Sequence, residues 1–285
     1  MLHDDQRIFA PSSINGWLIG WRRRSFERAR EMFSRAITLD SEFALAHSGL
    51  ADCCSYLYLY WEPTVDNLRV ADSASRRAIA LSPGLAEAQV SRAVALSTLR
   101  NYPEAEQAFR SAIGIDPNLF EARYFYGRAC LAQGKFKEAI APLQAACRLR
   151  EEDYQAPALL ALAYTGLGRR KSASRAQVRA VEVAKQQLSV NPGDVRALYL
   201  GAICLARLGR KQTALAWAAR ALGLDGKDSA VLYNVGCLYA ILGRTADALK
   251  CLKKVVRSGW RKEWIKHDPD WTSLHGLKEF AALVA

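Results

Sequence analysis

The sequence predicts an all-α fold, a solenoid of helix-turn-helix repeats that ends in a C-terminal capping helix. An alanine recurs in one register along almost the whole chain, at Ala29, Ala71, Ala105, Ala139, Ala173, Ala214 and Ala248. The steps between these alanines are 42, 34, 34, 34, 41 and 34 residues. A fixed period of this length indicates stacked supersecondary units, because one unit cannot bury its apolar face alone.

Small residues and helix-ending steps keep the same register. One small position holds Ala51, Ala93, Gly127, Ala161, Ala202 and Gly236, and a second holds Ala36, Ala78, Ala112, Ala146, Ala180 and Ala221. A helix-ending step recurs as Asp40-Ser41, Ser82-Pro83, Asp116-Pro117, Asn191-Pro192 and Asp225-Gly226. Small side chains let two helices pack at short distance, and proline cannot continue a helix. Each repeat is therefore predicted to be two packed helices.

Glycines mark the turn between the two helices of a repeat. They stand five residues before the recurrent alanine, at Gly134, Gly168, Gly209 and Gly243. Glycine adopts the left-handed conformation that ends many helices. These positions predict a short turn with a left-handed residue.

The pattern resembles the tetratricopeptide repeat, whose 34-residue signature reads W-x2-L-G-x2-Y…A-x3-F…P. The stretch VGCLY at residues 235–239 matches its L-G-x2-Y part, and Ala105, Phe109 and Pro117 match its A-x3-F…P part. The resemblance covers nearly the whole chain. It implies a right-handed superhelix in which the first helix of each repeat lines a concave groove.

One domain spanning residues 1–285 is predicted, and it contains seven repeats and a capping segment. In the first repeat Trp17 stands where a small residue belongs, so this repeat is expected to be divergent or partly frayed. The predicted repeats lie at about 10–43, 44–85, 86–119, 120–153, 154–194, 195–228 and 229–260, and the capping segment at 261–285.

Two repeats carry insertions. Eight extra residues in the second, within YLYLYWEPTVDN, are expected to lengthen its first helix and to add a loop at Pro63. Seven extra residues in the fifth equal about two helical turns, so its second helix should be longer.

The tail predicts one more amphipathic helix that covers the last apolar face, as the terminal units of solenoids must. Its apolar stripe is Leu274, Leu277, Phe280 and Leu283.

Two stretches carry a narrower resemblance. FSRAITLDSEFALAHSGLADCC at 33–54 and WIKHDPDWTSLHGLKEFAALV at 264–284 are similar to repeat regions attached to bacterial adenylate cyclases, Ser/Thr protein kinases and DNA-binding transcriptional regulators. In those families an effector domain precedes the repeats, whereas this chain begins almost at its first repeat. The resemblance implies bacterial signalling or regulation and transfers no catalytic activity.

Composition indicates a soluble, cytoplasmic protein with no membrane span. The start MLHDDQRIF has acids where a signal peptide needs bases, and no apolar run reaches the length of a membrane span. The seven cysteines form no CxxC pair, which favours reduced, buried thiols over a zinc site.

No sequence motif for catalysis is present. Kinase, phosphate-loop, dinucleotide and GxSxG signatures are missing, so we expect no enzyme activity, no cofactor and no small-molecule substrate. The stretch HDPD at 267–270 is compatible with a metal site, but a helix-start turn is the favoured interpretation.

A partner-binding groove is predicted on the first helices of the fourth, sixth and seventh repeats. Positions that share one helical face should point inward there. Three tyrosines fall at the same repeat position, and tyrosine suits recognition surfaces. Packing of these rings against the neighbouring repeat is an equally weighted alternative. The predicted groove residues are Glu121, Tyr124, Arg128, Arg196, Tyr199, Tyr233 and Asn234.

The function predicted from these observations is a non-catalytic scaffold or adaptor that binds a protein or peptide segment in its groove. The alternative is a nucleic-acid-binding regulator that uses a basic convex face, because the formal net charge is +12. A solvated face is the simpler interpretation, since aromatic residues do not alternate with these bases. The bases in question are Arg175, Arg179, Lys250, Lys253, Lys254 and Arg257.

Overall fold

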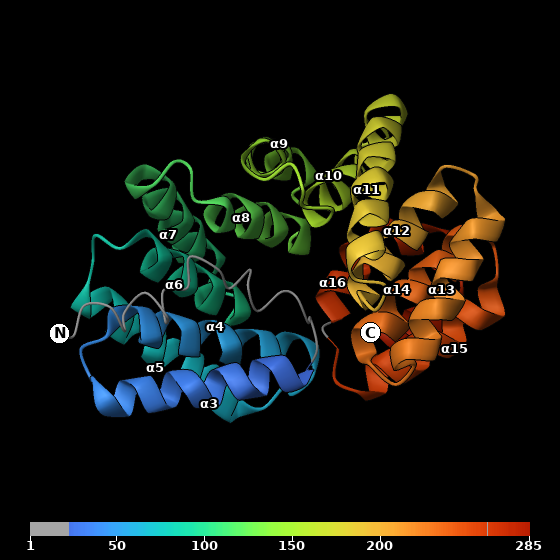
Figure 1. Ribbon diagram of the computed structural model, residues 1–285. Coiled ribbons are helices and arrows are strands. Elements are labelled where there is room, and N and C mark those ends of the chain that lie inside the picture. Colours follow the sequence, from blue (N-terminus) through green and yellow to red (C-terminus); the bar gives the residue numbers. More distant parts are fainter. Residues whose placement is uncertain (1–22, 261) are drawn as a thin grey trace. The chain divides into compact units, whose positions relative to one another are not determined.

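A computed structural model describes residues 23–260 and 262–285, and in these ranges the chain forms helices and no strands (Figure 1). The predicted all-α class of consecutive helix-turn-helix repeats is confirmed. The chain divides between Ala122 and Arg123 into two compact units, which are described separately. The divergent start of the first repeat, with Trp17, lies outside the described residues.

The first unit is a stack of antiparallel helix pairs. Within it α4 packs against α3, α5 and α6, and α6 packs against α7. Helix α4 has 17 residues and α6 has 13, so the insertion lengthens the first helix as predicted. The helices are α3 (Arg23–Leu39), α4 (Ala44–Tyr60), α5 (Val65–Leu81), α6 (Ala86–Thr98) and α7 (Tyr102–Ile115).

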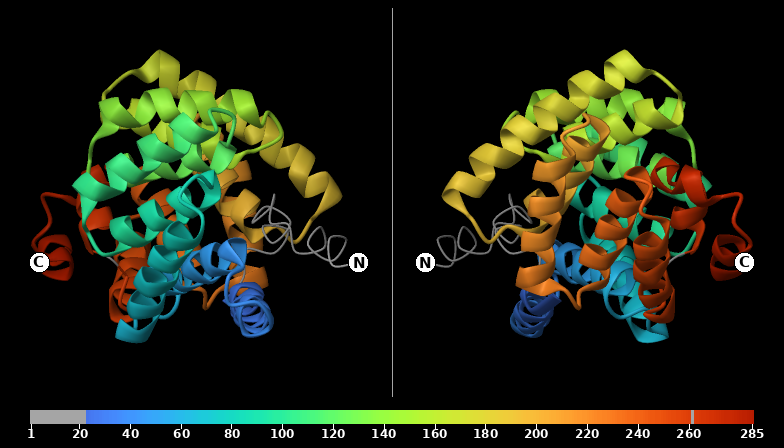
Figure 2. Two further views of the ribbon diagram at one scale, coloured as in Figure 1. Left: turned by 90° about the vertical axis from the view of Figure 1, so that its left-hand side faces the viewer. Right: turned by 90° about the vertical axis from the view of Figure 1, so that its right-hand side faces the viewer.

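The second unit repeats this arrangement. The pairs α10–α11, α12–α13 and α14–α15 each pack closely, and α12 lies beside both α10 and α14. The predicted longer helix is α11, which has 21 residues and is yellow in Figure 2. Helix α8 (Phe120–Ala132) leads into this unit. The helices that follow are α9 (Phe136–Leu149), α10 (Gln155–Gly166), α11 (Arg170–Val190), α12 (Val195–Arg207), α13 (Lys211–Asp225), α14 (Ser229–Ile241) and α15 (Thr245–Arg257).

The predicted left-handed turns are present. Gly134, Gly168, Gly209 and Gly243 have φ angles of 71°, 67°, 77° and 73°. In the third repeat Arg100 occupies the same register position and adopts φ 65°. Arg100 therefore keeps the turn geometry although it carries a side chain. A residue other than glycine pays a steric cost for this left-handed conformation.

Glycine in the first helix of a repeat makes room for a large side chain. A Cβ added to Gly127 would lie 2.5 Å from Leu143 Cγ, and one added to Gly201 would lie 2.3 Å from Trp217 Cζ3. Contacts this short are excluded for real side chains. These glycines therefore set how closely the two helices of a repeat approach.

The tail forms short helices rather than the single amphipathic helix predicted from its stripe. These are α16 (Lys262–His267), the 3-10 helix η2 (Pro269–Leu274) and α17 (Lys278–Val284). Gly276 separates the last two, since glycine is a poor helix former, and Leu277 is 37% exposed. Trp271, Leu274 and Phe280 are buried; η2 packs on α14, and α17 packs on α15. The capping role and the seven repeat boundaries stay predictions.

In the part of the chain that the structure describes, no helix combines the length and the apolar character needed to cross a bilayer.

Candidate functional site

An open pocket lies in the second unit, where α10, α12 and α14 run side by side and η2 contacts α10 and α14. It holds about 520 Å³ of space between atoms, including its open mouth. We call it the interhelix pocket. The residues that line it are Ala158, Leu159, Ala161, Leu162, Thr165, Gln177, Leu200, Ile203, Cys204, Arg207, Tyr233, Asn234, Trp264, Asp268 and Asp270.

The walls of the interhelix pocket are apolar because helical spacing places one stripe of each helix there. On α12 the apolar stripe is Leu200 and Ile203, and the charged Arg207 follows one turn later on the same face. On α10 the small side chains of Ala158 and Ala161 line the pocket and leave it open. This part of the pocket suits an apolar chain rather than a charged group.

An ion pair lies at one end of the pocket. Arg207, the last residue of α12, donates from Nη2 to Asp270 Oδ1 at 2.6 Å and to the Pro269 carbonyl at 3.2 Å. Asp270 is buried, and its charge offsets the cost of burying the guanidinium, so the pKa of Arg207 stays above its usual value. The pair fastens η2 to α12.

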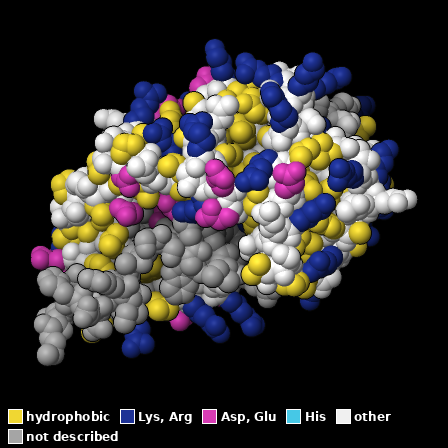
Figure 3. All heavy atoms as spheres, turned by 45° about the horizontal axis from the view of Figure 1, so that its top comes forward, with side chains coloured by type: hydrophobic (Ala, Val, Ile, Leu, Met, Phe, Trp, Pro, Cys, Tyr) yellow, Lys and Arg dark blue, Asp and Glu magenta, His cyan; other side chains and the backbone are white. Residues whose placement is uncertain are grey.

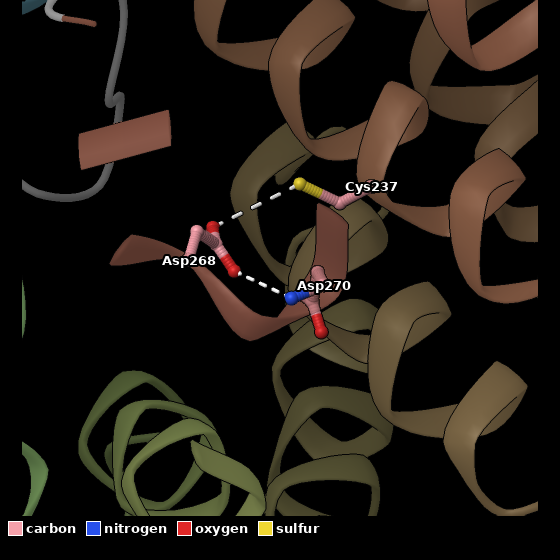
Figure 4. A group of neighbouring side chains, drawn as sticks. All are labelled: Cys237, Asp268 and Asp270. Carbon is pink, nitrogen blue, oxygen red and sulfur yellow. Dashed lines mark hydrogen bonds between the residues drawn. The ribbon is translucent and has the colours of Figure 1, made fainter. Parts of the chain in front are cut away.

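Asp268 is a second buried carboxyl beside this pair (Figure 4). Its Oδ1 accepts from the Asp270 backbone N–H at 2.9 Å, which caps η2, and its Oδ2 accepts from the Tyr233 hydroxyl at 2.6 Å. Burial raises the pKa of Asp268 to about 7, with the Asp270 charge adding to the effect. This capped helix start is the turn that the HDPD stretch favours.

Cys237, Asp268 and Asp270 place one ligand atom each within 4.8 Å of one another (Figure 4). These residue types are able to hold a metal ion. The positive charge of Arg207 lies 2.6 Å from Asp270, however, and it repels a cation. Burial also raises the pKa of the Cys237 thiol, which disfavours the thiolate that binds metal. The arrangement supports a structural cap better than a metal centre.

Two of the seven predicted groove residues, Tyr233 and Asn234, line the interhelix pocket. Asn234 is half-buried, and its Nδ2 donates to the Ala230 carbonyl at 2.7 Å. Arg128 lies over the ring of Trp264, with 5.7 Å from its Cζ to the ring centroid. Glu121 is half-exposed in α8 and belongs to the first unit.

The three predicted tyrosines are buried rather than open to the groove. Tyr124, Tyr199 and Tyr233 are 4%, 4% and 3% exposed. The Tyr124 hydroxyl donates to Gln155 Oε1 and accepts from Arg196 Nη2, both at 3.3 Å. The ring of Tyr233 stacks on Trp260, with 5.0 Å between centroids. These contacts support packing against neighbouring elements; partner binding by the seven residues stays a prediction.

The basic side chains named for the alternative function are exposed, as predicted. Figure 3 shows Lys and Arg side chains separated by uncharged ones on the face turned to the viewer. Lys253 pairs with Glu279 at 2.6 Å, and Arg179 donates to the Glu151 carbonyl at 3.0 Å. This distribution is typical of a solvated face.

Sequence reasoning did not single out four polar or aromatic residues of the pocket, Thr165, Gln177, Arg207 and Trp264, and it considered Asp270 only as part of HDPD. Gln177 lies on a second helix, which the groove prediction left out, and Trp264 and Asp270 belong to the tail. The signal available was the run WIKHDPDW, whose Asp-Pro step starts η2 inside the pocket.

Family models described as tetratricopeptide repeat match most of the chain. One matches residues 66–120 and 158–229, a second matches 96–146, and a third matches 229–258. No curated protein matches the sequence.

Solved structures share the fold at low sequence identity. A human IFIT1 dimer with PPP-AAAA is 15% identical, with a TM-score of 0.61 over 90% of this chain and 60% of that one. A human IFIT1 dimer with m7Gppp-AAAA is also 15% identical, with a TM-score of 0.62 over 90% and 59%. PilW, a widely conserved type IV pilus biogenesis factor, is 22% identical, with a TM-score of 0.51 over 70% and 86%. The chain thus spans about three fifths of the length of the IFIT1 chains.

Proposed function

The chain belongs to the tetratricopeptide repeat family, and on this premise we propose that it is a non-catalytic scaffold or adaptor that binds a segment of a partner protein. The observation that carries the proposal is the interhelix pocket, an open, mostly apolar recess on α10, α12 and α14. Binding sites are commonly concave and apolar with a few placed polar groups. The partner segment lies across these helices and places one side chain in the recess.

The proposed groove is limited to the second unit. Asn234 and Arg128 contribute half-buried polar groups, while Tyr124, Tyr199 and Arg196 hold the first helices in place through buried contacts. The resemblance to repeat regions of bacterial cyclases, kinases and regulators supports a cytoplasmic role in bacterial signalling.

A charge in the pocket wall should weaken partner binding. Leu200→Glu places a charge in the half-buried apolar stripe of α12 and should weaken capture of the partner at least about tenfold, since roughly 1.4 kcal/mol is a factor of ten. The measurement is affinity capture from the native cell with crosslinking, followed by mass spectrometry of the captured protein and of the crosslinked residues.

The matched control is Val178→Glu, the same substitution at an exposed position of α11 outside the pocket. It should capture the same partner at the parent level, and both variants should keep the parent's circular dichroism and melting curve. Parent-level capture by Leu200→Glu would show that the pocket is not the binding site. Crosslinks confined to the second helices of the repeats would show the same.

A further inference from the structure

The first part of the tail crosses the first helices of the second unit. An end cap needs to reach only the last helix pair, because the repeats of a solenoid contact their neighbours. This segment reaches further back: η2 packs on α10 as well as on α14, Trp264 in α16 contacts α8, and Asp270 in η2 contacts α12. We call residues 262–270 the strap. The strap lies on α8 and on the three helices that carry the interhelix pocket.

The strap is held as a bound peptide would be, because residues of the first helices contact both its backbone and its side chains. Arg207 on α12 donates to the Asp270 carboxylate at 2.6 Å and to the Pro269 carbonyl at 3.2 Å. On α14 the Tyr233 hydroxyl donates to Asp268 at 2.6 Å. These contacts fall on three consecutive residues of the strap, so one short acidic turn engages two different helices.

Two ring side chains extend the strap to α8. The ring of Trp264 faces Arg128, with 5.7 Å from the Arg128 Cζ to the ring centroid, and it lines the interhelix pocket. His267 lies against the turn that follows α8, where a Cβ added to Gly134 would be 3.0 Å from the His267 Nδ1. The glycine therefore makes room for the imidazole, and the strap spans from α14 back to the end of α8.

The strap is more weakly anchored than the remainder of the tail. After it, Trp271 and Phe280 are buried in an apolar cluster with residues of α14 and α15. Within α16, Ile265 is the one buried side chain of six residues, and Trp264 is half-buried. A helix this short is not stable by itself, so α16 depends on the contacts that it makes with the rest of the unit.

Closure of the strap also carries an electrostatic cost. It buries two carboxyls, Asp268 and Asp270, beside the one guanidinium of Arg207, and burial raises the pKa of Asp268 to about 7. The α14 side chains that face Asp268, Tyr233 and Cys237, are neutral, and no α10 residue of the pocket lining is charged. A displaced strap exposes Asp268 to water, where its pKa is about 4. The closed strap then keeps a proton that the displaced strap releases, so closure weakens as pH rises from 4 to 7.

We propose that the strap is an intramolecular ligand of the groove, and that the partner segment binds by displacing it while residues 271–285 stay in place. The Arg207 side chain is 25% exposed and loses its carboxylate partner when the strap leaves. A largely buried charge without a partner is unfavourable, so the incoming segment has to supply an acidic side chain in the place of Asp270. The inference rests on the proposed function and adds an autoinhibitory contact and an acidic partner segment.

The test uses the strap sequence itself as the probe, because it carries the acidic turn that the groove holds. The peptide KEWIKHDPD (residues 262–270), acetylated, amidated and fluorescently labelled, is titrated into the full chain and followed by anisotropy. We expect Asp270→Asn in the chain to bind the probe at least tenfold more tightly than the parent, since its own strap loses the ion pair with Arg207. Equal affinity for the two chains, or binding to neither, would overturn the inference.

Asp247→Asn is the matched control, because this acid of α15 is 43% exposed and lies outside the strap. It should bind the probe at the parent level, and both variants should keep the parent's circular dichroism. In the probe, asparagine in place of the final aspartate should lower the affinity for the Asp270→Asn chain at least fivefold. An unchanged affinity would contradict recognition of the acid by Arg207.

A reversible crosslink tests the displacement directly. The His267 Cβ lies 3.6 Å from the Cβ position of Gly134, which suits a disulfide. Arg100, at the same turn position of another repeat, shows that a side chain is accepted there. In the Asp270→Asn chain, Gly134→Cys with His267→Cys should lower the probe affinity at least tenfold when oxidised and restore it when reduced. Asp270→Asn alone should bind equally under both conditions. Equal affinity of the crosslinked and reduced chains would show that the probe binds without displacing the strap.

The two proposals fail in distinguishable ways. If the crosslink leaves probe binding unchanged but Leu200→Glu weakens partner capture, the strap inference is wrong and the scaffold function stands. If the crosslink prevents probe binding but Leu200→Glu captures the partner at the parent level, the strap is a ligand of the groove and the partner binds elsewhere, so the proposed function is wrong.

Discussion

Replacing Trp271 by alanine is expected to lower the free energy of unfolding of the second unit by about 3–5 kcal/mol, the usual cost of deleting a buried aromatic ring. Trp271 in η2 is fully buried. Its ring lies 5.8 Å from that of Tyr233 and 6.2 Å from that of Phe280, measured between centroids. Alanine would therefore leave a large cavity between the capping segment and α14.

The position of Trp271 depends on a glycine in α14. A Cβ added to Gly236 would lie 2.7 Å from Trp271 Cη2, so the ring fills the space that the missing side chain leaves. Gly127 and Leu143 have the same relation within a repeat. The tail thus covers α14 with the kind of contact that a repeat makes internally.

Urea unfolding of the parent and Trp271→Ala, followed by circular dichroism, measures this effect. Leu277→Ala is the control in the same segment, because Leu277 is 37% exposed and its loss should change stability by only about 0.5 kcal/mol. A Trp271→Ala variant that unfolds at the urea concentration of Leu277→Ala would show that the tail does not cap the last repeat.

Asp52→Asn is expected to stabilise the first unit strongly at pH 9 and by only about 1–2 kcal/mol at pH 5. Asp52 in α4 is buried; its Oδ2 accepts from Ser91 Oγ at 2.9 Å, and its Oδ1 has no partner among the described residues. Burial raises the pKa of Asp52 from 3.8 to about 8; the Ser91 bond opposes this effect and the charge of Glu121 adds to it.

The sign of the effect follows from proton linkage. Between pH 4 and pH 8 the folded state keeps a proton on Asp52 that the unfolded chain has released, so the free energy of unfolding falls as pH rises through this window. Above pH 8 the loss is on the order of 5 kcal/mol, since each unit of pKa difference corresponds to about 1.4 kcal/mol. Asparagine carries no charge at any pH and avoids this loss.

Urea unfolding at pH 5, 7 and 9 tests the prediction. The gap between Asp52→Asn and the parent should widen with each step in pH. Asp66→Asn serves as the control, because the Asp66 side chain is 72% exposed and should show no such widening. A gap that stays constant from pH 5 to pH 9 would mean that Asp52 does not titrate as a buried acid.

The repeat architecture could be predicted because its signals are local and recur. The recurrent alanines, the turn glycines and the two lengthened helices all depend on spacing within one repeat. Arg100 could not be identified as a left-handed residue, since arginine rarely adopts that conformation and only the register points to it.

The site was less predictable, because spacing gives the face of a helix but not what covers that face. Tyr233 lines the interhelix pocket, yet Trp260 at the end of the seventh repeat and Asp268 from the tail bury it. The break at Gly276 divides the expected single helix into η2 and α17, and the start of η2 places Asp270 beside Arg207. Contacts between the tail and a distant helix have no periodic signature.

The reactivity of the cysteines can be used to measure how fast individual helices open. Six of the seven thiols are buried, and burial raises the pKa of Cys54 to about 11 and those of Cys147 and Cys204 to about 12. Only the thiolate attacks an alkylating reagent, so alkylation of the six buried thiols near neutral pH has to wait until the helix that carries the thiol opens. The thiols are distributed over α4, α8, α9, α12, α14 and α15. Timed alkylation therefore yields the order in which individual helices open, and a solenoid held by nearest-neighbour contacts should be labelled from its ends inward.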